Sequence, residues 1–446
     1  MHLQRDEYRS GMRLTFLLLL AIATLALAGT ASATTYGPAS QAYAITATAT
    51  ADGRMTGSET LSFVNAEAAP VSTVWVRLWA NIGGCAHRRI TISALTGGTV
   101  ATTSHGCTAI QVQLDSPVQP QATGTLALRF AIALPHANAR LGTANGSSYY
   151  GNALPVLATT VDGVPLLTPP NGLGDPFAAQ TATWTIDLTW PAGLAAATGG
   201  APTSASAPSG KRRAVFSSPA ARDVTIAIGP WRERTASVAG TRIRVLAPNG
   251  VKTDGLLSAT RSSYSRMTQR YGATGQSTLD VVITPGLESY GMEYSGLVLT
   301  EPSKETLVHE VAHEWFSELV GNNGFAEPWL DEGNTTYAQL RDLGRLGDCD
   351  VSRPFAGYGT ARLTWSLAQF AQHTDWYDAV YDGAACALVK LDRDWGAGAV
   401  DGIQRAWVAR YRAGFTTTAD YIALLRERAP AGYDVDAFLR YARLTP

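Results

Sequence analysis

The sequence predicts a mixed α+β protein of two domains, because its two halves follow different hydrophobic patterns. Its 446 residues exceed the size of one ordinary hydrophobic core. Apolar and polar residues alternate over residues 34–239, which is typical of β-strands, whereas helical spacing dominates residues 240–446. We therefore expect an antiparallel β-sandwich or saddle, followed by a helix-rich domain.

The first 33 residues have the pattern of a secretion signal. Arg13 precedes an apolar run over residues 14–28, and residues 31–33 (Ala-Ser-Ala) fit the small-x-small cleavage rule. This run is shorter than the roughly 20 residues that cross a membrane. We expect a secreted, extracellular chain that begins near Thr34 and has no stable membrane association. The alternative is an uncleaved N-terminal anchor.

The charge balance excludes two classes of partner. The chain carries 35 Lys and Arg against 36 Asp and Glu, a net charge of −1. Such a chain has no basic surplus to hold nucleic acid or an anionic membrane surface. The oligomeric state stays open.

Strand patterns separated by Gly, Pro, Asn and Asp fill the first half. The alternating segments are residues 43–50, 73–79, 109–115, 124–134 and 183–190. Residues 191–210 are rich in Ala, Gly, Ser and Pro and lie before a further strand pattern. We therefore expect a long surface hairpin loop there.

Four cysteines fall two in each half, as Cys85 and Cys107, then Cys349 and Cys386. Export permits disulfides, and four cysteines allow three pairings. None has the Cys-x-x-Cys spacing of metal or redox ligands. We expect pairing within each half.

The second half has one buried-strand pattern, at residues 279–284, among segments with helical spacing. The helical segments are residues 256–272, 305–320, 333–343, 386–395, 402–412 and 419–429.

One of these helices carries a candidate metal site, His309-Glu310-Val311-Ala312-His313. Residues four apart share a helix face, so both imidazoles can reach one metal ion. Glu310 then stands beside the metal, free to take a proton from water. Ser303 is expected to cap the start of this helix, and Gly321 to end it.

A third ligand is predicted at Glu332, which eighteen intervening residues separate from His313. Residues 321–328 supply a turn, so a second helix starting near Glu332 can fold back. Two histidines and a glutamate leave a fourth position open, which is typical of a catalytic zinc. We expect one Zn²⁺ per chain, with Asp331 or Thr335 orienting a zinc histidine.

These motifs carry a family resemblance. Residues 309–316 (HEVAHEWF), followed by Glu332 within WLDEG, resemble the gluzincin family of aminopeptidase N. Residues 290–296 (YGMEYSG) are similar to the Gly-x-Met-Glu substrate motif of that family, and residues 380–385 (VYDGAA) to its Tyr-x-x-Gly-Ala segment. The resemblance implies a saddle-shaped β domain followed by a thermolysin-like zinc peptidase domain.

The resemblance also implies roles. Glu310 is the general base and then the acid, and Tyr381 donates a hydrogen bond to the oxyanion. Gly291, Met292 and Glu293 hold the substrate, with Glu293 pairing with its α-ammonium. The expected substrates are peptides, from which N-terminal residues are released.

The sequence departs from the family pattern at several points. Tyr294 stands where the family has Asn, and Gly383-Ala384 where Lys-Gly is usual. The β-domain residue that helps to hold the α-amine is expected within residues 147–157. Since 65 residues follow Tyr381, without the family's large C-terminal helical domain, we expect an open site.

Two alternatives to an aminopeptidase remain. One is an endopeptidase or oligopeptidase with the same zinc chemistry. The other is a catalytically inactive surface-binding protein, which the presence of both Glu310 and Tyr381 disfavours. His373 and Tyr377 are weaker candidates for the oxyanion site.

Overall fold

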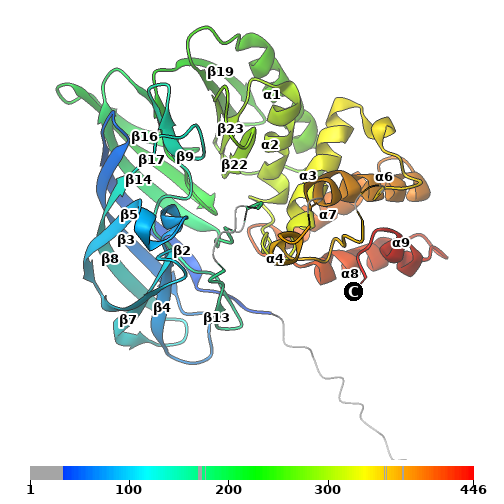
Figure 1. Ribbon diagram of the computed structural model, residues 1–446, viewed down its shortest axis with the longest axis horizontal. Helices are drawn as coiled ribbons and strands as arrows, with labels where there is room; N and C mark the ends of the chain where they lie inside the picture. The colour runs from blue at the N-terminus through cyan, green and yellow to red at the C-terminus, as the bar shows by residue number, and fades with distance from the viewer. Residues whose placement is uncertain are drawn as a thin grey trace, which may run out of the picture. The chain divides into compact units, whose positions relative to one another are not determined.

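The computed structural model describes residues 34–168, 173–175, 177–355, 357, 359–373 and 376–445. Thr35–Pro446 form one compact unit, in which strands dominate the first half and helices the second (Figure 1). The predicted secretion signal, residues 1–33, lies outside the described residues. No helix within the described ranges is long and apolar enough to cross a membrane.

A large sheet dominates the first half. Among the described residues its order is β16 (Ala201–Ser206), β17 (Lys211–Ala221), β14 (Ala182–Pro191), β2 (Ala39–Ala49), β3 (Arg54–Val64), β8 (Thr123–Ala133) and β5 (Ile90–Thr96). Neighbouring strands are antiparallel except β14 and β2, which are parallel. This pair differs from the antiparallel arrangement expected, and the long chain path between the two strands makes it possible.

Smaller sheets complete the first half. The first joins β11 (Val156–Leu157), β4 (Val71–Arg77), β7 (Ala109–Val118) and β6 (Gly98–Ser104). The second joins β15 (Ala195–Ala197), β18 (Ala227–Gly229), β10 (Ser147–Tyr150) and β9 (Leu141–Ala144). The third joins β1 (Tyr36–Gly37), β12 (Thr160–Val161) and β13 (Val164–Pro165).

The alternating patterns place one face of the large sheet in a core. On β3, Leu61 and Phe63 are buried, and on β14 Trp184 and Ile186 are buried. The ring of Tyr43 stacks on that of Trp184 with centroids 4.1 Å apart. All five alternating segments are strands, which confirms the prediction for this half.

The prediction of a hairpin loop over residues 191–210 is wrong in part, because this segment contains β15 and β16. β16 is an edge strand with mostly exposed Ala, Thr and Ser side chains. An edge strand needs only one paired side, so a sequence without a hydrophobic face can still form it.

Both disulfides join cysteines of the same half, as predicted. Cys85 pairs with Cys107, and Cys349 pairs with Cys386. The first disulfide closes a loop that begins with the short helix η2 (Cys85–His87), and the short helix η1 (Trp79–Asn81) lies just before this loop.

The second half packs helices on a mixed sheet. Its strand order is β19 (Arg232–Val238), β20 (Thr241–Ala247), β21 (Thr278–Ile283), β23 (Leu297–Thr300) and β22 (Gly291–Tyr294), with β22 at an edge. The longer helices are α1 (Asp254–Tyr271), α2 (Lys304–Phe316), α3 (Pro328–Leu343), α6 (Ala384–Trp395), α7 (Ala399–Tyr411) and α8 (Thr418–Arg428). Short helices are η3 (Leu346–Asp348), α4 (Leu367–Phe370), α5 (Trp376–Asp378), the π-helix η4 (Ala379–Gly383) and α9 (Val435–Tyr441).

Two helix limits differ from the prediction. Ser303 caps α2 by accepting a hydrogen bond from the Thr306 amide, as expected, but α2 ends at Phe316 rather than at Gly321. The amides of Ser317 and Glu318 both bond to the carbonyl of His313, and the wide turn closed by the second bond ends the helix. α3 begins at Pro328 instead of near Glu332, because proline suits the first turn of a helix.

The division of the chain into two domains, residues 34–239 and 240–446, stays a prediction. A hydrophobic cluster contains Tyr149 and Ala227 from the first half together with Leu246 and Leu299 from the second.

The guanidinium of buried Arg222 ties the first half to the second. It donates to the carbonyls of Ala179 (3.1 Å), Ser317 (3.1 Å), Glu318 (3.0 Å) and Gly414. Burial lowers its pKa to about 10, so the group stays charged at neutral pH. One buried cation therefore donates hydrogen bonds to carbonyls from three distant parts of the chain. Two of these carbonyls, those of Ser317 and Glu318, follow α2.

Candidate active site

Three donor atoms converge where α2 faces α3. His309 and His313 lie one turn apart on α2, with their Nε2 atoms 3.1 Å apart. Glu332 Oε2 on α3 lies 3.2 Å from His309 Nε2 and 3.4 Å from His313 Nε2. The structure thus brings together the three predicted ligands.

The spacing of these atoms fits zinc. Ligand atoms of a tetrahedral zinc at 2.0–2.1 Å stand roughly 3.3–3.4 Å from one another. Burial raises the pKa of Glu332, but His313 and His309 lower it more, and the net pKa lies far below the ordinary value. The site therefore offers two imidazole nitrogens and an anionic oxygen, the donor set that zinc prefers.

The outer nitrogens of both histidines are held by side chains of α3. His313 Nδ1 lies 2.6 Å from Asp331 Oδ1 and 3.2 Å from Thr335 Oγ1. His309 Nδ1 lies 3.4 Å from Gln339 Oε1. Gln339 was not predicted, although its position two turns after Glu332 on the same helix is a usable signal.

Glu310 is buried beside the ligands and faces Gly291 of β22. A Cβ atom at position 291 would stand 2.0 Å from Glu310 Oε1, so glycine alone leaves room for this carboxylate. Among the described residues, Glu310 Oε2 has no hydrogen-bond partner. Burial raises the pKa of Glu310 to about 7, which suits a group that exchanges protons at neutral pH.

Tyr381 reaches the site from the π-helix η4. Its hydroxyl donates to Glu332 Oε1 at 2.5 Å, and burial raises its pKa, which keeps the hydroxyl protonated. The ring of Tyr377 stacks on that of Tyr381 with centroids 4.0 Å apart, but Tyr377 is 53% exposed. The ring of His373 packs against that of Trp365, with centroids 4.5 Å apart and the planes tilted by 31°. The phenol nearest the ligands is therefore that of Tyr381.

A cavity of about 690 Å³ opens over these groups. Gly291, Met292 and Glu293 of β22 line it together with the three ligands, Glu310 and Tyr381. Donor atoms of Glu293, Glu310 and His313 lie within 4.8 Å of one another. Burial, followed by the charge of Asp175, raises the pKa of Glu293 well above its ordinary value.

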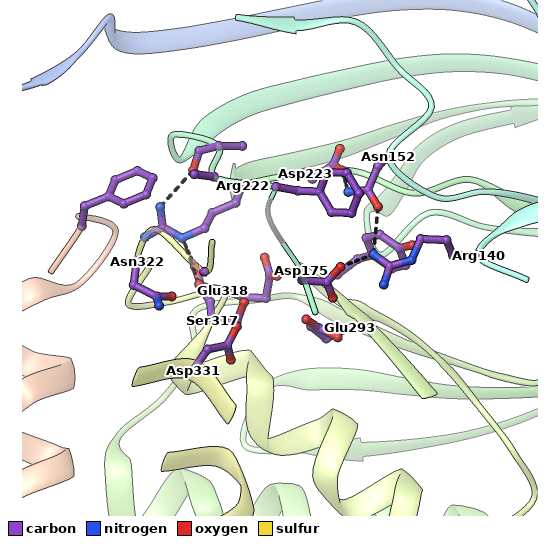
Figure 2. A pocket seen from close by; sticks show the side chains of 17 residues that line it. Arg140, Asn152, Asp175, Arg222, Asp223, Glu293, Ser317, Glu318, Asn322 and Asp331 are labelled. Atoms are coloured by element: carbon purple, nitrogen blue, oxygen red, sulfur yellow. Dashed lines mark hydrogen bonds and ion pairs between the residues drawn. The ribbon is translucent and has the colours of Figure 1, made fainter. Parts of the chain in front are cut away.

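Next to Glu293 lies a group of polar side chains, several of them from the first half of the chain (Figure 2). Asp175 lines the cavity of about 690 Å³ and forms an ion pair with Arg140. Asn152 lies in the segment 147–157 that was singled out, and it donates to Asp223 at 2.7 Å. Asp175 and Arg140 were not predicted, because they lie outside every motif.

Two departures from the family pattern have a steric explanation. The hydroxyl of Tyr294 would stand 2.1 Å from a Cβ at position 151, so Tyr294 fits because residue 151 is glycine. Likewise a Cβ at Gly383 would stand 2.6 Å from the ring of Phe355. At both positions, the residue of this chain therefore fits the space that its neighbours leave.

Comparison with known proteins agrees with this geometry. Residues 275–440 match the peptidase family M1 domain. The chain is 30% identical to aminopeptidase B of Mus musculus over 103 residues, and 26% identical to leucine aminopeptidase 2 of Eremothecium gossypii over 171 residues. These alignments cover 19% and 33% of this chain, but only 16% and 27% of the two relatives.

Solved structures match over a much larger share. A mutant M1 zinc metallopeptidase from Deinococcus radiodurans superposes with a TM-score of 0.71 at 19% identity, covering 92% of this chain and 95% of that one. A second structure of that mutant, bound to a Tyr-Ser-Ala substrate, gives a TM-score of 0.71 at 20% identity with the same coverage. The fold is thus shared over both halves, and residues 275–440 carry the peptidase family M1 domain.

Proposed function

We propose that the protein is a secreted zinc aminopeptidase, which releases N-terminal residues from peptides with one Zn²⁺ per chain. The observation that carries this proposal is the convergence of His309, His313 and Glu332 on one point, with Glu310 beside it. Both relatives described above are named as aminopeptidases, which supports the same activity.

Zinc held by the three ligands would polarise a carbonyl oxygen and lower the pKa of water from about 15.7 to about 7. Glu310 takes the proton of the attacking water and delivers it to the leaving amine. The Tyr381 hydroxyl donates a hydrogen bond to the oxygen of the scissile carbonyl as negative charge develops there. These roles need groups that exchange or donate a proton near pH 7, and Glu310 is buried while Tyr381 is partly buried.

The substrate is held by β22. Since β22 is the edge strand of its sheet, its outer side can pair with an extended peptide. Glu293 accepts the α-ammonium. Among the residues whose positions are described, no group hydrogen-bonds the Glu293 carboxylate, so an incoming ammonium supplies the missing counter-charge.

A buried carboxyl group here favours an aminopeptidase, whose substrate ammonium stabilises the ionised form of Glu293, over an endopeptidase, whose substrates carry an uncharged amide at the same position. The placement of Glu310 and Tyr381 disfavours an inactive surface-binding protein. The Deinococcus radiodurans structure bound to a Tyr-Ser-Ala substrate supports peptides as the substrate class.

The experiment compares aminoacyl-arylamides with N-acetylated peptides, using the mature protein with and without a zinc chelator. We expect hydrolysis of the free-amine substrates alone, abolished by chelation and restored by zinc. Glu310→Gln should keep zinc and lose activity by about 10²–10⁴-fold. Glu427→Gln, a change on the exposed surface of α8, serves as the control. Faster cleavage of N-acetylated peptides would replace this proposal by the endopeptidase.

Secretion has its own test. The protein recovered from the culture medium should begin near Thr34 when its N-terminus is sequenced. Recovery of the chain with an intact N-terminus in the membrane fraction would favour the uncleaved anchor.

A further inference from the structure

A second chamber, of about 560 Å³, adjoins the catalytic cavity. Arg140, Gly174 and Ser289 line both spaces. Arg140 also lines the small pocket that contains Glu293. The chamber therefore opens at the Glu293 end of the catalytic cavity.

Its walls are largely apolar. The large apolar side chains that line it are Trp79, Ile82, Pro135, Leu141 and Phe177. The rings of Trp79 and Phe177 meet edge to face with centroids 5.0 Å apart. Ile82 is 41% exposed, so its side chain is accessible to a ligand in the chamber. A cavity of this volume, with aromatic walls, suits a bulky apolar group.

The charges around the chamber are balanced. Arg140 is neutralised by its ion pair with Asp175. The chamber also contains Arg89 and Glu288, which carry opposite charges. Neither an acidic nor a basic side chain has an electrostatic advantage there, and apolar contact decides which group is bound.

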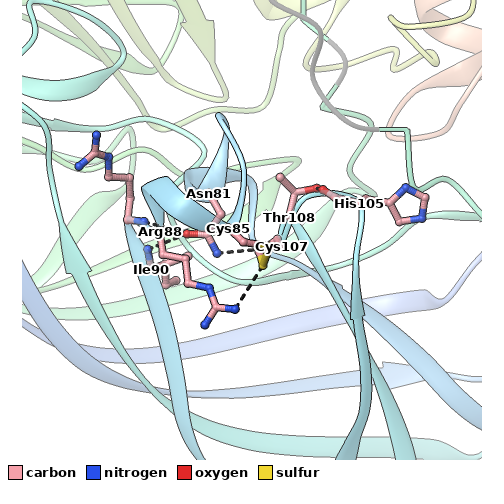
Figure 3. The surroundings of a disulfide bond; sticks show 8 residues. Asn81, Cys85, Arg88, Ile90, His105, Cys107 and Thr108 are labelled. Atoms are coloured by element: carbon pink, nitrogen blue, oxygen red, sulfur yellow. Dashed lines mark hydrogen bonds between the residues drawn. A yellow bond between two sulfur atoms is a disulfide. The ribbon is translucent and has the colours of Figure 1, made fainter.

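The wall that carries Trp79 and Ile82 is fixed by the first disulfide. Asn81, between them, donates through Nδ2 to the Cys107 carbonyl at 2.9 Å and accepts from the amides of Arg89 (2.8 Å) and Ile90 (3.0 Å). Figure 3 shows Asn81 between the Cys85–Cys107 bridge and Ile90. This loop is therefore held in place before any substrate arrives.

We propose that the chamber receives the side chain of the N-terminal residue, and that it makes the enzyme select bulky apolar, above all aromatic, N-terminal residues. The proposal rests on the aminopeptidase function proposed above. With the ammonium held at Glu293, the adjoining chamber is the space into which the side chain of the same residue can extend. Burying a phenylalanine side chain instead of a methyl group should raise kcat/KM about 10–150-fold.

The test measures kcat/KM of the wild-type enzyme on alanyl-, leucyl-, phenylalanyl- and tryptophanyl-arylamides, and then on Ile82→Trp. An indole at this exposed position fills the chamber without disturbing a core. We expect aromatic substrates to be preferred by the wild type and to lose at least about tenfold in Ile82→Trp, while alanyl-arylamide is unaffected. Val100→Trp is the matched control, because Val100 is 47% exposed on β6, outside both spaces.

The outcomes separate this inference from the proposed function. Hydrolysis of every arylamide at similar rates, or an equal loss on all of them in Ile82→Trp, overturns the chamber as the selective site and leaves the aminopeptidase standing. If Ile82→Trp impairs only N-acetylated or N-terminally extended peptides, the chamber holds chain beyond the scissile residue, and the inference is wrong. If the wild type hydrolyses no arylamide, the function and the inference fail together.

Discussion

Asp331 and Glu332, consecutive in the sequence, approach opposite nitrogens of the same imidazole. Asp331 Oδ1 lies 2.6 Å from His313 Nδ1, while Glu332 Oε2 lies 3.4 Å from His313 Nε2. A carboxylate can only accept, so the proton of neutral His313 lies on Nδ1 and the lone pair of Nε2 faces the metal position. One turn of α3 thus supplies a ligand and fixes the tautomer of another.

Replacing Asp331 should weaken metal binding without removing a ligand. Asp331→Asn should lower zinc affinity about 10–100-fold, as loss of a histidine-orienting carboxylate does. Competition with a chromophoric chelator measures the affinity, and Asp348→Asn, on the exposed helix η3, is the control. Unchanged affinity would show that Thr335 alone orients His313.

Tyr381→Phe should reduce kcat on the order of 10²–10³-fold, because it removes a donor to the developing oxyanion. KM should change little. Tyr377→Phe keeps the stacked ring and loses a half-exposed hydroxyl, so its kcat should stay near that of the wild type. The reverse result in the two variants would assign the oxyanion role to Tyr377.

Glu293→Gln should affect free-amine substrates selectively. A charge-assisted contact between carboxylate and ammonium contributes roughly 1.5–3 kcal/mol, so kcat/KM on free-amine peptides should fall about 10–150-fold. Matched N-acetylated peptides, which lack the ammonium, are the internal reference. An equal loss on both kinds of substrate would show that Glu293 merely supports the fold of the cleft.

Asp223 should make stability depend on pH. Burial, followed by the charge of Glu318, raises its pKa to about 7, against roughly 3.9 in an unfolded chain. Between these values the folded state holds the extra proton, so the contribution of Asp223 to stability falls as pH rises from about 4 to 7. Asp223→Asn removes this dependence.

Urea unfolding at pH 5 and pH 8 measures the effect. The free energy of unfolding of Asp223→Asn, relative to that of the wild type, should be about 2–3 kcal/mol higher at pH 8 than at pH 5. A constant difference between the two proteins would mean that Asp223 titrates normally in the folded state.

The sequence predicted what depends on short-range spacing. His309 and His313 share one face of α2 because of helical periodicity. Glu332 lies on the next helix, α3, which a short connecting segment joins to α2. The strands of the first half were likewise evident from alternation. Helix ends were less accurate, since the end of α2 at Phe316 depends on a turn whose carbonyls Arg222 binds from far away in the chain.

The sequence could not predict cavity walls that are formed by residues far apart in the chain. Asp175 stands alone in a Gly- and Pro-rich segment, and nothing near it in the sequence suggests that it lines the catalytic cavity. The apolar chamber needs Ile82, Leu141 and Phe177, which share no periodicity. Such surfaces arise from tertiary packing, which hydrophobic patterning does not encode locally.

The contacts of Arg222 limit how far the chain can be shortened without disturbing the candidate site. A fragment starting at residue 240 would keep every predicted zinc ligand and catalytic side chain, yet the carbonyls of Ser317, Glu318 and Gly414 would lose their buried donor. The turn after the zinc helix would then be left without support. Truncation and domain-grafting designs should therefore retain the strand-rich half, because the turn beside the metal site depends on hydrogen bonds from that half.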